Sequence, residues 1–143
     1  MALLDNQVSQ QVSQFFQSMQ DSVTIEFFAG PEAEMAETFS ELINEVADLS
    51  DLVMVKTTDT APTLEPGHGG NEAITGPVAE LLDNTGRHTG VRFLGIPSGH
   101  EFGAFLEALK AVSTHTSTLS EKTREQLATI QNPLHIQVFT TPT

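Results

Sequence analysis

The sequence predicts an α/β fold in which a mixed four-stranded sheet is flanked by helices. Between residues 23 and 57 the order is strand, helix, strand, which favours a parallel pair. Between residues 78 and 95, two apolar segments flank a turn-rich hexapeptide, as in an antiparallel hairpin. An amphipathic helix follows Pro97. These elements supply both kinds of strand pair and the helices that cover a sheet.

The first third of the chain alternates between helical and strand patterns. Apolar side chains recur at steps of three and four over residues 3–19, which predicts a helix. The β-branched and aromatic run Val23–Phe28 predicts a strand, which Gly30 and Pro31 end. Pro31 suits the first turn of a second helix, whose apolar stripe continues to about residue 49.

The middle of the chain contains a loop and the hairpin. Residues 52–57 predict a second strand, and residues 58–76 predict a loop because they are rich in proline and glycine. Strands over 78–82 and 90–95 form the expected hairpin around residues 83–88. Its return strand leads through Pro97 into the third helix.

The C-terminal part is predicted as an appendage. A polar linker over 113–118 precedes a fourth helix near residues 120–130, and an apolar, alternating strand is expected over 134–140. This order divides the chain into a unit over 1–113, including the N-terminal helix, and a remainder over 114–143. The remainder has the pattern expected of a linker helix and the first strand of a second unit.

Composition excludes several classes of function. The chain has 143 residues, a formal net charge of -13 and no cysteine, so it has no thiol chemistry of its own. All ten charged residues of the first 55 are acidic, which disfavours nucleic-acid binding. This acidity favours either solubility or an acidic docking face for a basic partner. No apolar run reaches the roughly 20 residues of a membrane span, and no signal peptide is evident, so a cytoplasmic location is expected.

Motifs for metal, cofactor or hydrolytic sites are absent. The five histidines form neither an i,i+4 pair nor a cluster with cysteine, so no metal site is predicted. The Gly-rich segment 67–70 lacks the Lys-Ser/Thr of a phosphate loop, and no cofactor is expected. The Gly-x-Ser-x-Gly motif of many hydrolases does not occur.

Two segments carry a family resemblance. Residues 90–102 (GVRFLGIPSGHEF) resemble the strand–turn–helix of glutaredoxin-like protein disulfide oxidoreductases with two tandem thioredoxin folds. They are also similar to the N-terminal domain of the flavoprotein component of alkyl hydroperoxide reductase. Residues 136–143 (IQVFTTPT) resemble the strand that runs into Cys-Pro-Tyr-Cys in the first family. Residues 30–39 contain none of the cysteines that first units often carry, which brings the chain closer to the reductase domain.

The resemblance implies a thioredoxin-like fold and two site residues. Glu101 would lie near the dithiol of a second unit, oppose thiolate formation and exchange protons. The spacing of Ser98 and Glu101 also fits a capping box that begins the third helix, and the two roles are compatible. Pro77 lies where such folds place a cis-proline beside a peptide groove, and it is either a binding residue or only an element of the fold.

Three functions follow from this interpretation. The leading hypothesis is a non-catalytic thioredoxin-like half of a dithiol-disulfide oxidoreductase, whose second unit passes electrons to a disulfide in a partner protein. The alternative is a free-standing, redox-inactive binding module that uses the groove near Pro77 or the acidic face. The third is an oligomerising domain, a homodimer that pairs through the C-terminal strand.

Overall fold

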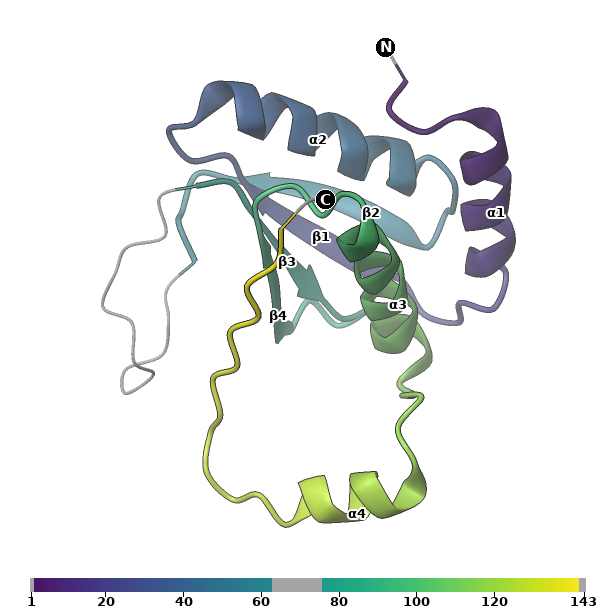
Figure 1. The fold of residues 1–143 in the computed structure, drawn as a ribbon, viewed down its shortest axis with the longest axis vertical. Helices are drawn as coiled ribbons and strands as arrows, with labels where there is room; N and C mark the ends of the chain where they lie inside the picture. Colours follow the sequence, from purple (N-terminus) through teal and green to yellow (C-terminus); the bar gives the residue numbers. More distant parts are fainter. Residues whose placement is uncertain (1, 63–75, 142–143) are drawn as a thin grey trace.

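A computed structural model describes residues 2–62 and 76–141 of the chain (Figure 1). The elements in chain order are α1 (Asn6–Phe16), β1 (Val23–Phe28), α2 (Ala33–Ala47), β2 (Val53–Thr58), β3 (Val78–Leu82), β4 (His88–Leu94), α3 (His100–Thr114) and α4 (Glu121–Ala128). The Gly-rich segment 67–70, with its His68, lies outside the described residues. None of the helices in the described ranges combines the length and hydrophobicity that crossing a lipid bilayer requires.

The four strands form one mixed sheet in the order β2-β1-β3-β4. β1 pairs in parallel with β2 and antiparallel with β3, and β3 pairs antiparallel with β4. The predicted fold class is therefore confirmed for the sheet: the strand–helix–strand opening gives the parallel pair, and the hairpin gives the antiparallel one.

The core lies between the sheet and the first three helices. On β1, Val23, Ile25 and Phe27 are buried in one cluster with residues of α1, α2 and α3. Two edge-to-face aromatic pairs join helix to strand in this layer, Phe27 with Phe39 and Phe93 with Phe105. Because strand side chains alternate between the two faces, the side chains between these β1 residues point to the other face.

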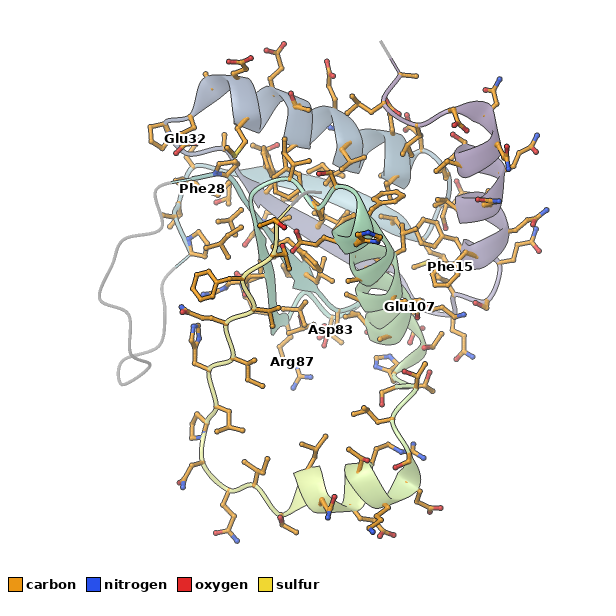
Figure 2. All side chains as sticks on the ribbon, viewed as in Figure 1. Phe15, Phe28, Glu32, Asp83, Arg87 and Glu107 are labelled. Carbon is orange, nitrogen blue, oxygen red and sulfur yellow. The ribbon has the colours of Figure 1, made fainter. Side chains whose placement is uncertain are left out.

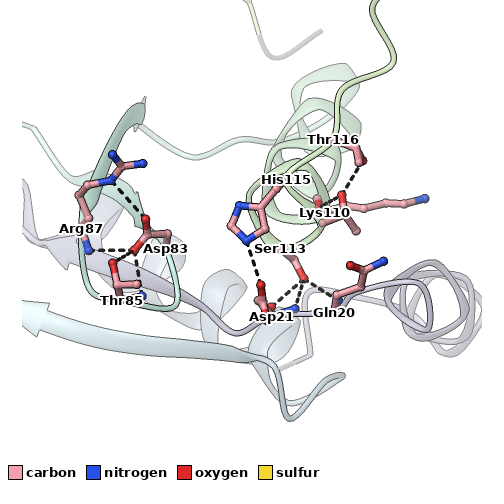
Figure 3. Close-up of polar contacts among 10 residues, drawn as sticks. Gln20, Asp21, Asp83, Thr85, Arg87, Lys110, Ser113, His115 and Thr116 are labelled. Carbon is pink, nitrogen blue, oxygen red and sulfur yellow. Dashed lines mark hydrogen bonds and ion pairs between the residues drawn. The ribbon is translucent and has the colours of Figure 1, made fainter.

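The C-terminal end of α3 is hydrogen-bonded to the turn between α1 and β1 (Figure 3). The fully buried Ser113 hydroxyl accepts hydrogen bonds from the amides of Gln20 (2.9 Å) and Asp21 (3.2 Å) and donates one to the Asp21 carbonyl (2.6 Å). His115 Nε2 lies 2.9 Å from Asp21 Oδ2. A single serine thus satisfies three backbone groups of the turn, although the sequence pattern places it in a linker.

Asp83 organises the turn of the β3–β4 hairpin (Figure 3). Its Oδ1 accepts hydrogen bonds from the Thr85 hydroxyl (2.6 Å), the Thr85 amide (2.9 Å) and the Arg87 amide (3.0 Å), and Arg87 Nε lies 3.3 Å from Oδ2. These donors, the Thr85 hydroxyl first and the Arg87 amide next, lower the pKa of Asp83 to about 2.

The lowered pKa of Asp83 predicts a pH-dependent contribution to stability. An unfolded aspartate has a pKa of about 3.9, so the folded state binds fewer protons between that pH and about 2. The contribution is present above about pH 4 and is lost as the pH falls through 2. Urea unfolding at pH 5, 4, 3 and 2 should show a shallower fall in stability for Asp83→Asn than for the wild type. Asp51→Asn, at an exposed aspartate, should keep the wild-type slope; equal slopes for the two variants would contradict the prediction.

Candidate functional site

The C-terminal segment runs as an extended chain beside β4 (Figure 1). After α4, residues 131–141 contain no helix or strand, and α4 itself contributes no buried residue. A groove separates the segment from the sheet; residues 90–94, Glu101 and residues 134–140 line it. The apolar side chains of the segment are exposed, with 79% of Ile136 and 90% of Phe139 accessible to solvent.

The strand predicted over 134–140 is therefore not formed within this chain. A strand requires a neighbour that accepts and donates its backbone hydrogen bonds, and the sheet of the described residues ends at β4 without the segment. The alternating apolar pattern correctly indicates an extended segment. Its apolar face is exposed in this chain, and its pairing with a second chain or unit stays a prediction.

Glu101 lies at the N-terminal end of α3 and lines the groove. Its Oε2 accepts a hydrogen bond from the Thr140 hydroxyl at 3.0 Å, so the helix and the C-terminal segment meet here. The predicted capping box is not formed, because Gly99, with φ of 59° and ψ of -127°, is the N-cap and no side chain caps the helix. Starting the helix after Gly99 puts Glu101 one position too early to reach back to Ser98.

Pro77 is fully buried just before β3. The described residues contain no cis peptide bond, so the cis configuration expected at Pro77 is not found. Trans is the intrinsically favoured form of an X–Pro bond. The Pro77 carbonyl accepts a hydrogen bond from the Gly95 amide (2.9 Å), which extends the β3–β4 ladder. A binding role for Pro77 stays a prediction.

A second group of polar side chains lies at one level of the sheet. Neighbouring strands there place Lys56, Glu26, Glu80 and Arg92 side by side in register. His88, at the start of β4, lies beside the two glutamates. Sequence spacing gave no signal for this group, because its members come from four strands and meet only through the strand register.

Of the other histidines, His135 lines the groove, His100 is exposed at the start of α3, and His115 pairs with Asp21.

Comparisons with known proteins relate 96% of the chain to curated proteins of two names, an alkyl hydroperoxide reductase subunit and an NADH dehydrogenase. No family model matches the sequence. The alkyl hydroperoxide reductase protein AhpF of Escherichia coli is 27% identical over 137 residues, which cover 96% of this chain and 24% of that protein. The NADH dehydrogenase of Bacillus subtilis is 26% identical over 137 residues, which likewise cover 96% of this chain and 24% of that protein. The chain thus spans about a quarter of the length of the curated relatives it matches.

Solved structures place the likeness in the N-terminal part of AhpF. AhpF of Enterococcus faecalis superposes with a TM-score of 0.74 and 27% identity over 90% of this chain and 61% of that one. The N-terminal domain of the same protein gives a TM-score of 0.71 with 28% identity. The chain is similar to the N-terminal domain of AhpF. A protein disulfide oxidoreductase from Aeropyrum pernix shares the thioredoxin-like fold, with a TM-score of 0.66 and 21% identity over 90% of this chain and 56% of that one. The resemblance stated from the sequence is confirmed.

Proposed function

We propose that this chain is the non-catalytic thioredoxin-like half of a dithiol-disulfide oxidoreductase, whose redox dithiol lies in a second unit beyond these residues. The observation that carries the proposal is the position of the apolar C-terminal segment. The segment lies beside β4 with its apolar side chains exposed, and the Thr140 hydroxyl donates a hydrogen bond to Glu101. A second unit would supply the strand partner and the burial that the segment lacks here. The matched relatives, which are about four times longer, are consistent with further units.

The proposed chemistry is thiol–disulfide exchange in the second unit. A thiolate attacks one sulfur of the partner's disulfide, and the second thiol then resolves the mixed disulfide. The dithiol is oxidised to a disulfide, and the partner's disulfide is reduced to two thiols by the same two electrons and two protons. This chain, which contains no cysteine, contributes the packing surface and the Glu101 carboxylate.

The proposed role of Glu101 is to act on such a dithiol through the C-terminal segment. Its carboxylate holds Thr140, and the residues that follow are those that resemble the approach to Cys-Pro-Tyr-Cys. A carboxylate near the dithiol disfavours the thiolate and accepts or returns its proton. The predicted capping box is not formed. Among the described residues, the Glu101 carboxylate instead accepts its hydrogen bond from Thr140.

The gene and a reductase assay test this proposal together. The codons after Thr143 should encode Cys-x-x-Cys in frame within a few residues. Dithiothreitol-driven insulin reduction should be accelerated by that longer protein and not by residues 1–143 alone. A stop codon directly after Thr143, or a longer product without reductase activity, would overturn the proposal. The stop codon would favour the free-standing module, which would bind its partner through the groove near Pro77 or through the acidic face.

Glu101→Gln in the longer protein tests the role of the carboxylate. Removing the negative charge should lower the pKa of the nucleophilic cysteine, because an adjacent anion opposes thiolate formation. The measurement is the pH dependence of iodoacetamide alkylation. Glu107→Gln is the matched control, since this exposed glutamate lies on the same helix and does not line the groove (Figure 2). An unchanged thiol pKa in Glu101→Gln, or equal shifts in both variants, would reject the role.

A further inference from the structure

A row of four charges crosses the sheet on the face opposite the helical core. Lys56 on β2 is in register with Glu26 on β1, Glu26 with Glu80 on β3, and Glu80 with Arg92 on β4. The neighbours of Glu26 along β1, Ile25 and Phe27, belong to the core cluster, so Glu26 points to the other face. Two carboxylates are therefore direct cross-strand partners, an arrangement that destabilises a sheet.

Each carboxylate of the row uses only one oxygen for a flanking cation. Glu26 Oε1 lies 2.9 Å from Lys56 Nζ, and Glu80 Oε2 lies 3.3 Å from Arg92 Nε. Glu80 is only 3% exposed, yet its buried Oε1 accepts no hydrogen bond from the described residues. A buried acceptor without a hydrogen bond costs free energy, which makes Glu80 Oε1 an unusual feature of this fold.

The remaining oxygens face the imidazole ring of His88. Nδ1 of His88 lies 3.3 Å from Glu80 Oε1, and Nε2 lies 3.9 Å from Glu26 Oε2. Glu26, Glu80 and His88 each have one possible ligand atom within 4.8 Å of those of the other two residues. The three side chains line a hollow that also reaches Thr58 and Pro62. His88 is 57% exposed in its side chain, which leaves the ring free to turn toward an ion.

We propose that Glu26, Glu80 and His88 bind a divalent first-row transition-metal ion such as Zn²⁺. Two carboxylate oxygens and one imidazole nitrogen are a donor set that Zn²⁺ accepts, and three protein ligands leave a position for water. An ion between the two glutamates would also occupy the acceptor that lacks a hydrogen bond. The alternative is a purely electrostatic row in which Lys56 and Arg92 balance the carboxylates and no ion binds. This site is independent of any dithiol in a second unit.

Zinc titration of the full chain tests the proposal. Calorimetry with ZnCl₂ in a non-chelating buffer should show one saturable site per chain, and the melting temperature should rise with Zn²⁺. Mg²⁺ at the same concentration should do neither, because it does not favour imidazole. His88→Gln should weaken Zn²⁺ binding at least tenfold, whereas His100→Gln, at the exposed start of α3, should leave it unchanged.

The choice of variants distinguishes a loss of Zn²⁺ binding from a loss of folding. His88 is exposed, so His88→Gln should retain the wild-type circular dichroism spectrum even where Glu80→Gln does not fold. Co²⁺ in place of Zn²⁺ adds a second measurement, since its visible absorption reports the ligands directly and should change in His88→Gln. No saturable binding at millimolar Zn²⁺ would overturn the proposal. It would equally be overturned if His88→Gln bound as tightly as the wild type, or if His100→Gln lost binding to the same extent.

Discussion

Phe105→Ala is expected to lower the free energy of unfolding by about 3–5 kcal/mol, the usual cost of removing a fully buried aromatic ring. Phe105 has no exposed surface and lies on the side of α3 that faces the sheet. Its ring packs edge to face on Phe93, with centroids 5.1 Å apart. Alanine would leave a cavity between α3 and β4, which the surrounding structure closes only in part.

The C-terminal segment provides the matched control for this prediction. Phe139→Ala removes the same ring from a side chain that is 90% exposed, so the stability of the isolated chain should stay within about 0.5 kcal/mol of the wild type. The chain has no tryptophan or tyrosine, and urea unfolding is best followed by far-ultraviolet circular dichroism. Equal losses for the two variants would mean that the segment is packed as firmly as the core.

Local patterns predicted most of the fold because the relevant physics is local. The apolar stripe that ends near residue 49 became α2, and the turn-rich hexapeptide 83–88 became the hairpin turn that Asp83 holds. Helix periodicity and turn chemistry act over a few residues, so a single sequence contains them. The resemblance over 90–102 then implied the thioredoxin-like fold, which periodicity alone leaves open.

The features that sequence missed depend on long-range partners or on one backbone angle. The segment 134–140 has a strand pattern, but whether it pairs depends on a neighbour that the described residues do not provide. The capping box failed because Gly99 adopts a positive φ that only glycine takes readily, which moved the start of α3. The group around Glu80 required the register of four strands, which no spacing in the sequence encodes.

Ser113→Ala is expected to destabilise the chain by about 1–3 kcal/mol, because it removes a buried hydroxyl that satisfies backbone groups of the turn before β1. The Asp21 amide keeps a hydrogen bond to the Ser113 carbonyl (3.2 Å), but the Gln20 amide and the Asp21 carbonyl lose their partner in this contact. The exposed His115–Asp21 pair cannot compensate, since such pairs contribute about 0–1 kcal/mol.

Ser18→Ala is the control for the loss of a serine hydroxyl in the same region of the chain. Ser18 is exposed, and its hydroxyl donates a hydrogen bond to the Phe15 carbonyl. Water can donate to that carbonyl in place of the hydroxyl, so Ser18→Ala should cost less than about 0.5 kcal/mol. Urea midpoints and hydrogen exchange of the Gln20 amide give two independent measurements. If Ser113 fastens α3 to the turn, Ser113→Ala should lower the midpoint and speed exchange at Gln20, whereas Ser18→Ala should change neither. Equal midpoints and unchanged exchange would show that the helices and the sheet hold this turn in place without Ser113.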